Sequence, residues 1–178
     1  MRTMQPTGSY MVPGLSLGVF RILFGLMYLD MALQKAPWIV TDGHRFGWLY
    51  GWIEKEIAHP TFGFYTAFLK NVFLPNFTFF GYMGFFTEIA LAISFILGLF
   101  TVLGGVGGTL WMVNIAMGGY SVPGEWAWLW MLLIVPQIVF AHSRAGRVLG
   151  VDQILHRQLI EGEQEKRGGL GQLVLRFA

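Results

Sequence analysis

The sequence predicts an all-α integral membrane protein, a bundle of four transmembrane helices with amphipathic interfacial helices in the long first connection and in the C-terminal tail. Of the 178 residues, 54% are hydrophobic and only 12% are charged, with a mean hydropathy of +0.55. A soluble domain carries about 25% charged residues. The apolar residues also gather into runs of about 20, the length of helix that crosses a hydrocarbon layer of about 30 Å.

Four such runs are predicted to span the membrane, over residues 14–33, 79–101, 102–119 and 126–141. The polar start of the chain and the length of the first run indicate a retained helix rather than a cleaved signal peptide. The second and third runs follow each other almost directly, which predicts a tight antiparallel hairpin. Residues 1–142 are therefore predicted to form one bundle.

The outer connection, residues 36–76, is predicted to contain two short helices. Residues 46–57 place two tryptophans and several aliphatic side chains on one side and charged side chains on the other, which suits the headgroup layer. Residues 61–74 are rich in Phe and Tyr, and Pro75 is predicted to stop that helix. At about 14 residues it is too short to span, which favours an interfacial segment or a lid over the bundle.

The distribution of basic residues predicts the topology. Six of the twelve Lys and Arg residues follow the fourth run, in a cytoplasmic amphipathic tail over residues 143–178. An even number of spans then places both termini on the cytoplasmic side of the inner (cytoplasmic) membrane, and the outer connection outside. The net charge of +2 gives no reason to expect a nucleic-acid partner.

Each predicted span contains a polar residue: Arg21, Glu88, Asn114 and Gln137. Counting helix rise from the cytoplasmic ends places these side chains in one intramembrane polar layer about 10 Å thick. An unpaired charge at that depth is costly, so we expect Arg21 and Glu88 to pair, with the amides as neighbours. Two interpretations stay open: an ion pair that fixes helix order, or a site for a small polar headgroup or for a proton step near a quinone ring.

An outer cluster follows at the end of the first run, with Asp30, Gln34 and Lys35. One interpretation is an interfacial anchor in which Asp30 pairs with a loop residue such as Arg45. The other is a contact for a headgroup or substrate beneath the aromatic lid.

The chain has no cysteine. It therefore offers no disulfide, no Cys-ligated cluster and no covalently attached haem. The four histidines lie outside the predicted spans, so no bis-His haem and no metal site are expected. Redox chemistry would need a bound quinone, another non-covalent cofactor or a partner subunit.

Several short motifs together resemble the DoxX/DoxD family of small membrane proteins. They are Arg21 with Gly25, Leu33-Gln34-Lys35, Glu88, Gly98-Leu99-Phe100-Thr101, and Gly146-Arg147 through Asp152. The long aromatic outer connection is more similar to the DoxD type. This resemblance implies a membrane subunit similar to the small subunit of thiosulfate:quinone oxidoreductase, which passes electrons from a sulfur compound into membrane quinone together with a partner.

Two functions are compatible with these features. The first is an accessory subunit of a quinone-linked oxidoreductase, in which Arg21, Glu88 and Asn114 line or brace the site and Asp30 and Lys35 lie at its outer mouth. The second is a structural subunit of a larger respiratory or photosynthetic complex with other membrane subunits as partners. A transporter or channel is less consistent with four short spans and no internal repeat.

Overall fold

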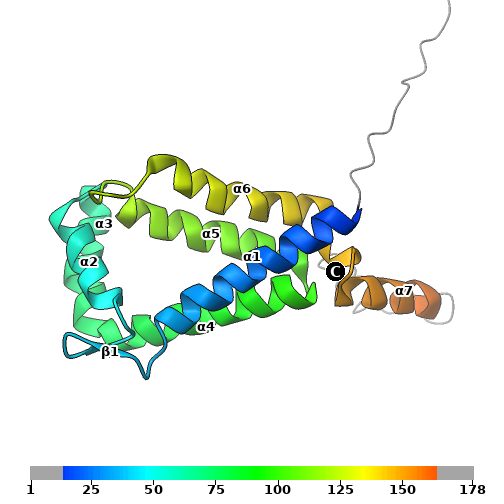
Figure 1. Cartoon of the computed structure of the whole chain (residues 1–178), viewed down its shortest axis with the longest axis horizontal. Helices are drawn as coiled ribbons and strands as arrows, with labels where there is room; N and C mark the ends of the chain where they lie inside the picture. Colours follow the sequence, from blue (N-terminus) through cyan, green and yellow to red (C-terminus); the bar gives the residue numbers. More distant parts are fainter. Residues whose placement is uncertain (1–13, 164–178) are drawn as a thin grey trace, which may run out of the picture.

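The computed structural model describes residues 14–163 (Figure 1). The predicted polar start of the chain and the end of its basic tail, with Lys166, Arg167 and Arg176, lie outside the described residues. The long helices are α1 Gly14–Gln34, α4 Phe77–Leu97, α5 Thr101–Gly119 and α6 Ala127–Ser143.

Three helical segments are long and apolar enough to cross a membrane: Gly14–Gln34, Gly63–Leu97 and Thr101–Gly119. The fourth apolar helix, α6, is shorter, with 17 residues. These are the features of a multi-pass, mainly α-helical membrane protein.

The four helices pack as two pairs, α1 with α4 and α5 with α6. Figure 1 shows the pairs close together near α7 and diverging toward α2 and α3. The predicted tight hairpin between α4 and α5 is therefore wrong except at its turn. That turn is short, with Gly98 and Phe100 both in the left-handed conformation (φ 64° and 50°), but each helix buries its face against a different neighbour.

The predicted helix stop at Pro75 is also wrong. The segment α3, Gly63–Phe68, continues through a π-helical turn, Leu69–Phe73, and a 3₁₀ turn, Leu74–Asn76, into α4. Pro75 lies in the first turn of the next helical segment. Backbone N–H groups in a first turn have no partner within the helix, so the missing N–H of proline costs no helical hydrogen bond there. The chain consequently bends without breaking, as helices do at proline and at π turns.

The helix α2, Leu49–Ala58, follows a two-stranded hairpin, β1 Val40–Thr41 with β2 His44–Arg45. Asp42 and Gly43 form its turn with φ values of 51° and 80°, as a type I′ turn requires. We refer to α2 and α3 as the lid, because they cross the end of the bundle where the helix pairs diverge (Figure 1).

The core lies between the helix pairs toward α7, and aromatic rings fill it. Phe24 meets Phe95 and Phe140 edge-on, with ring centroids 5.9 and 5.6 Å away, an arrangement that the ring quadrupoles favour. Beyond α6, a 3₁₀ turn, Ala145–Arg147, leads into α7, Val151–Glu163.

Candidate functional site

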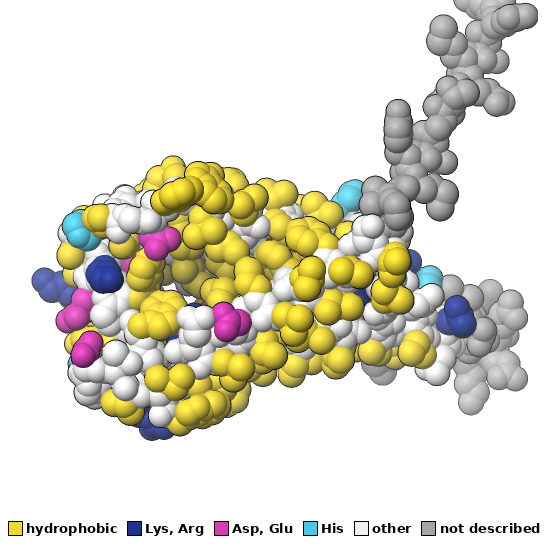
Figure 2. All heavy atoms as spheres, viewed as in Figure 1, with side chains coloured by type: hydrophobic (Ala, Val, Ile, Leu, Met, Phe, Trp, Pro, Cys, Tyr) yellow, Lys and Arg dark blue, Asp and Glu magenta, His cyan; other side chains and the backbone are white. Residues whose placement is uncertain are grey.

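A cavity of about 450 Å³ lies beneath the lid, and we call it the lid cavity. Figure 2 shows this face of the molecule hollowed toward the lid end, with hydrophobic side chains around the hollow. Cavities of this size with a mainly apolar wall are typical of sites for small organic ligands. Aromatic side chains supply much of the wall: Trp48, Trp52, Tyr65, Phe73, Phe80, Phe85, Trp111 and Trp130.

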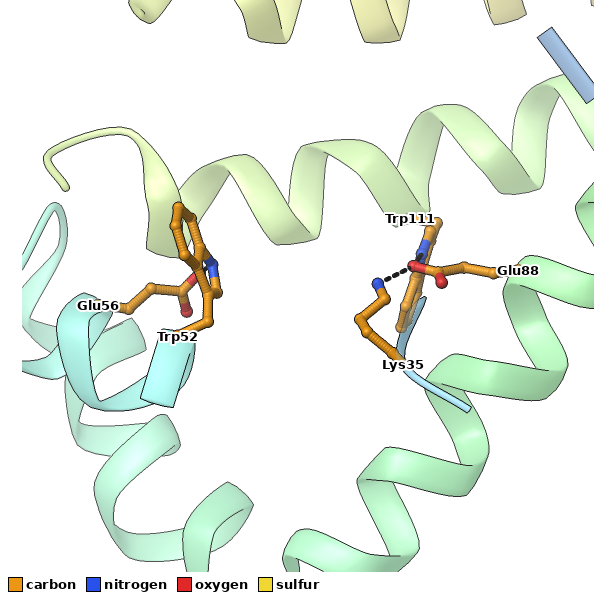
Figure 3. A network of polar contacts seen from close by, with 5 residues as sticks. All are labelled: Lys35, Trp52, Glu56, Glu88 and Trp111. Atoms are coloured by element: carbon orange, nitrogen blue, oxygen red, sulfur yellow. Dashed lines mark hydrogen bonds and ion pairs between the residues drawn. The ribbon is translucent and has the colours of Figure 1, made fainter. Parts of the chain in front are cut away.

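Polar groups reach the lid cavity from opposite sides (Figure 3). Trp52 and Glu56 extend into it from α2, and Lys35 faces them beside Glu88 and Trp111. A few polar groups in an otherwise apolar cavity are what orients a bound ligand.

Glu88 forms an ion pair with Lys35, the residue that follows α1. The Lys35 Nζ lies 2.6 Å from Glu88 Oε1, and the Trp111 indole donates a 3.5 Å hydrogen bond to the same oxygen. Glu88 is fully buried and Lys35 is 8% exposed, with its ammonium 5.3 Å from the centroid of the Trp48 ring. The pair therefore joins α1 to α4 at the wall of the lid cavity.

Arg21 lies far from Glu88, at the α7 end of the bundle, so the predicted Arg21–Glu88 pair is wrong. Its fully buried guanidinium donates to four backbone carbonyls, those of Phe95 (2.8 Å), Ala145 (2.5 Å), Val148 (2.9 Å) and Leu149 (3.0 Å). Carbonyls at helix ends and in turns lack hydrogen-bond partners within a helix. The Arg21 guanidinium provides the donors for these four carbonyl groups. Arg21 thus ties α1 to α4 and to the segment before α7.

Asp152 lies near Arg21 and caps the N-terminus of α5. Its carboxylate accepts hydrogen bonds from the Phe100 and Thr101 amides at 2.6 and 2.9 Å, and from the Thr101 hydroxyl at 2.8 Å. Side-chain acceptors of this kind satisfy the free amides at a helix N-terminus. The Asp152 amide donates to the Gly98 carbonyl at 2.9 Å. Three sequence segments, around Arg21, Gly98–Thr101 and Gly146–Asp152, therefore meet here.

The predicted polar layer is not one cluster. Asn114 lines the lid cavity and accepts a 3.3 Å hydrogen bond from the Tyr65 hydroxyl. Gln137 is fully buried in the core, where it accepts a 3.1 Å bond from Tyr28 and donates to the Leu133 carbonyl at 2.7 Å. Asn114 and Gln137 lie on the paired helices α5 and α6 but bond to different neighbours, so the predicted common depth did not bring them into contact.

The predicted outer cluster separates as well. Asp30 and Gln34 are exposed on α1 and hydrogen-bond to each other at 2.6 Å, while Lys35 turns inward to Glu88. Asp30 does not pair with Arg45. The Arg45 Nε donates to the Pro37 carbonyl at 2.8 Å instead, and its guanidinium lies 5.7 Å from the centroid of the Tyr82 ring.

The sequence prediction missed Glu56, which lines the lid cavity and is only 3% exposed. Burial raises the pKa of Glu56 to about 7, although the 2.7 Å hydrogen bond from the Trp52 indole favours the ionised form. A signal was present in the sequence. Glu56 follows Trp52 by four residues and Ile53 by three, which places it on the apolar side of α2.

Trp130 lines the lid cavity from α6. The side chain is 5% exposed, and its indole N–H is buried without a hydrogen-bond partner among the described residues. Buried tryptophan N–H groups normally have a partner. This donor has no partner among the described residues, and it belongs to a side chain that lines the cavity.

Within residues 14–163, no group of three or more His, Asp or Glu side chains is arranged to hold a metal ion. The site is thus a mainly aromatic cavity in a multi-pass membrane protein, with a buried ion pair at one side and a buried carboxyl group at the other. Comparison with protein-family models, with curated proteins and with solved structures finds no match for this chain.

Proposed function

We propose that this chain is a quinone-binding membrane subunit of a DoxX/DoxD-like oxidoreductase, and that the quinone ring occupies the lid cavity. The observation that carries the proposal is an aromatic cavity of about 450 Å³ whose wall includes Trp130, a side chain with an unpartnered indole N–H. A quinone has a flat ring that packs against aromatic side chains and two carbonyl oxygens that accept hydrogen bonds. The Lys35 ammonium provides a second donor on the wall of the cavity.

The membrane arrangement proposed with this function has four spans in the inner membrane. The helix α6 lies alongside α5 over most of its length (Figure 1), so that a bilayer crossed by α5 also contains α6. Its 17 residues extend about 25 Å, which a locally thinned bilayer accommodates. Arg144 and Arg157 are exposed at the α7 end, which we assign to the cytoplasm.

The electrons are proposed to come from a partner subunit. With no cysteine, the chain has no thiol and no ligands for a Cys-bound cluster that could carry them. The resemblance to the small subunit of thiosulfate:quinone oxidoreductase makes a sulfur compound the first donor to test. Mass spectrometry of the protein purified in mild detergent would identify the partner and any bound quinone.

Binding of a short-chain benzoquinone to the purified protein in nanodiscs tests the site directly. We expect saturable binding that weakens about fivefold in Trp130→Phe, because this change removes a hydrogen bond worth about 1 kcal/mol and keeps an aromatic ring. The matched control is Trp128→Phe on the same helix, where the side chain is 53% exposed. Absence of saturable binding to the wild type would reject the proposal, and equal weakening in both variants would remove Trp130 from the site.

A further inference from the structure

Glu56 has an environment that differs from that of the other buried carboxylate near the lid cavity. Glu88 is held by the Lys35 ammonium, whereas Glu56 receives one hydrogen bond, from the neutral Trp52 indole. Within residues 14–158, no Lys, Arg or His forms an ion pair with Glu56. A buried carboxyl group without a cation favours its protonated form. Glu56 can therefore gain or lose a proton near neutral pH.

The titratable groups that face Glu56 come from three other parts of the chain. Lys35, Tyr65 and Glu125 also line the lid cavity. The Lys35 ammonium is engaged by Glu88, and the Tyr65 hydroxyl donates to Asn114. No neighbour therefore supplies a positive charge that would hold Glu56 ionised when the cavity is filled.

Glu56 lies at the lid end of the cavity, between α2 and α5. It lies on α2, outside the membrane-spanning segments, and its sequence neighbours Glu54 and Lys55 are exposed. On its inner side it contacts the backbone of α5 at Gly118, where any added Cβ atom would collide with its carboxyl group. Gly118 thus makes room for the Glu56 carboxyl group beside the cavity.

We propose that Glu56 is the proton-exchanging group of the lid cavity: it takes up a proton when a quinone binds and donates it to a quinone oxygen when the ring is reduced. This inference rests on the proposed function. Reduction of a quinone to a quinol consumes two electrons and two protons. The electrons come from the reduced partner subunit. For each proton, the O–H bond of Glu56 breaks as an O–H bond forms on the quinone, and the carboxylate regains a proton from water at the outer surface.

Calorimetric titration of the full-length protein with a short-chain benzoquinone, repeated in buffers of different ionisation enthalpy, measures this uptake without any turnover. At pH 7, the wild type is expected to take up about half a proton per quinone, because a group with a pKa of about 7 is half protonated there. The uptake should approach one proton as the pH rises further. Glu56→Gln should bind quinone with no uptake, and the control Glu54→Gln on the same helix should match the wild type.

The outcomes of this titration distinguish the role of Glu56 from the presence of a quinone site. Quinone binding with equal proton uptake in the wild type and in Glu56→Gln overturns the role of Glu56 and leaves the quinone site intact. Absence of quinone binding to the wild type overturns both proposals. Trp52→Phe offers a second variant if Glu56→Gln does not fold. It removes the donor that favours the carboxylate, so the uptake at pH 7 should fall below the wild-type value and return at higher pH. Unchanged uptake in Trp52→Phe would likewise overturn the inference.

Discussion

At the scale of single residues, charge pairing determines what the polar side chains of this protein do. Lys35 and Glu88 occupy an apolar environment together, where each charge offsets the cost of burying the other. The positive charge of Arg21 is instead stabilised by four carbonyl dipoles and by the nearby Asp152 carboxylate. The Lys35–Glu88 pair lies at the wall of the lid cavity, where Lys35 can contact a ligand. The Arg21 guanidinium is engaged by four backbone carbonyls and holds helices together.

Breaking the Lys35–Glu88 pair should destabilise the fold more than removing both charges. We expect Lys35→Met to lower the free energy of unfolding by about 3–5 kcal/mol, since it leaves a buried carboxylate uncompensated. The double variant Lys35→Met/Glu88→Gln should recover most of that loss. Thermal unfolding in detergent measures both effects, with Lys55→Met, an exposed lysine on α2, as the control expected to stay within about 0.5 kcal/mol of the wild type. Additive losses in the double variant would contradict the pairing.

At the scale of helices, small residues determine which pairs form. Gly104 and Gly108 are four residues apart, a spacing of small residues that predicts a face for close helix packing. On α5, however, the closest approach to another backbone occurs at Gly105. A Cβ atom there would lie 2.5 Å from the Gln137 carbonyl oxygen of α6, while Gly104 and Gly108 contact side chains of Ser94 and Gln137. Gly105 and Gly108 therefore pack against α6, whereas Gly104 packs against α4.

Alanine substitutions on α5 should separate packing from helix propensity. Gly105→Ala is expected to destabilise the protein by about 1–3 kcal/mol through overpacking against α6. Gly107→Ala, two residues away with no atom within 4 Å of the added Cβ, should be neutral or stabilising by up to about 1 kcal/mol. Denaturant titration of the purified protein compares the two. A loss of equal size in both variants would show that α6 does not pack against Gly105.

At the scale of the whole molecule, the lid and α7 lie at opposite ends of the bundle (Figure 1). The absence of cysteine makes the native chain a ready background for labelling. We expect a membrane-impermeant maleimide to modify Glu54→Cys in intact cells and Arg157→Cys only after the membrane is permeabilised. The unmodified chain provides the blank. The reverse pattern would invert the proposed orientation, and labelling of both sites from one side would contradict the proposed membrane arrangement.

The sequence by itself determined the class, a mainly α-helical membrane protein, and the bounds of two of its long helices. Its long apolar runs predict α1 and α5 to within one residue at each end, because hydrophobic length in a membrane depends on local composition alone. It also contained unused local signals, namely the Asp42-Gly43 hairpin turn and the place of Glu56 on the apolar side of α2.

Only the tertiary structure decided which polar groups meet. Counting depth along each helix assumes that all helices begin at the same level, yet the Arg21 side chain lies beside Phe95 and Gly98 at the end of α4. Arg21 therefore does not reach Glu88, and Lys35 pairs with Glu88 instead. The partners of Arg21 are carbonyls as many as 128 residues away, set by a turn that no local pattern positions. The lid cavity likewise exists only because the bent segment between α3 and α4 carries the lid across the opening between the two pairs.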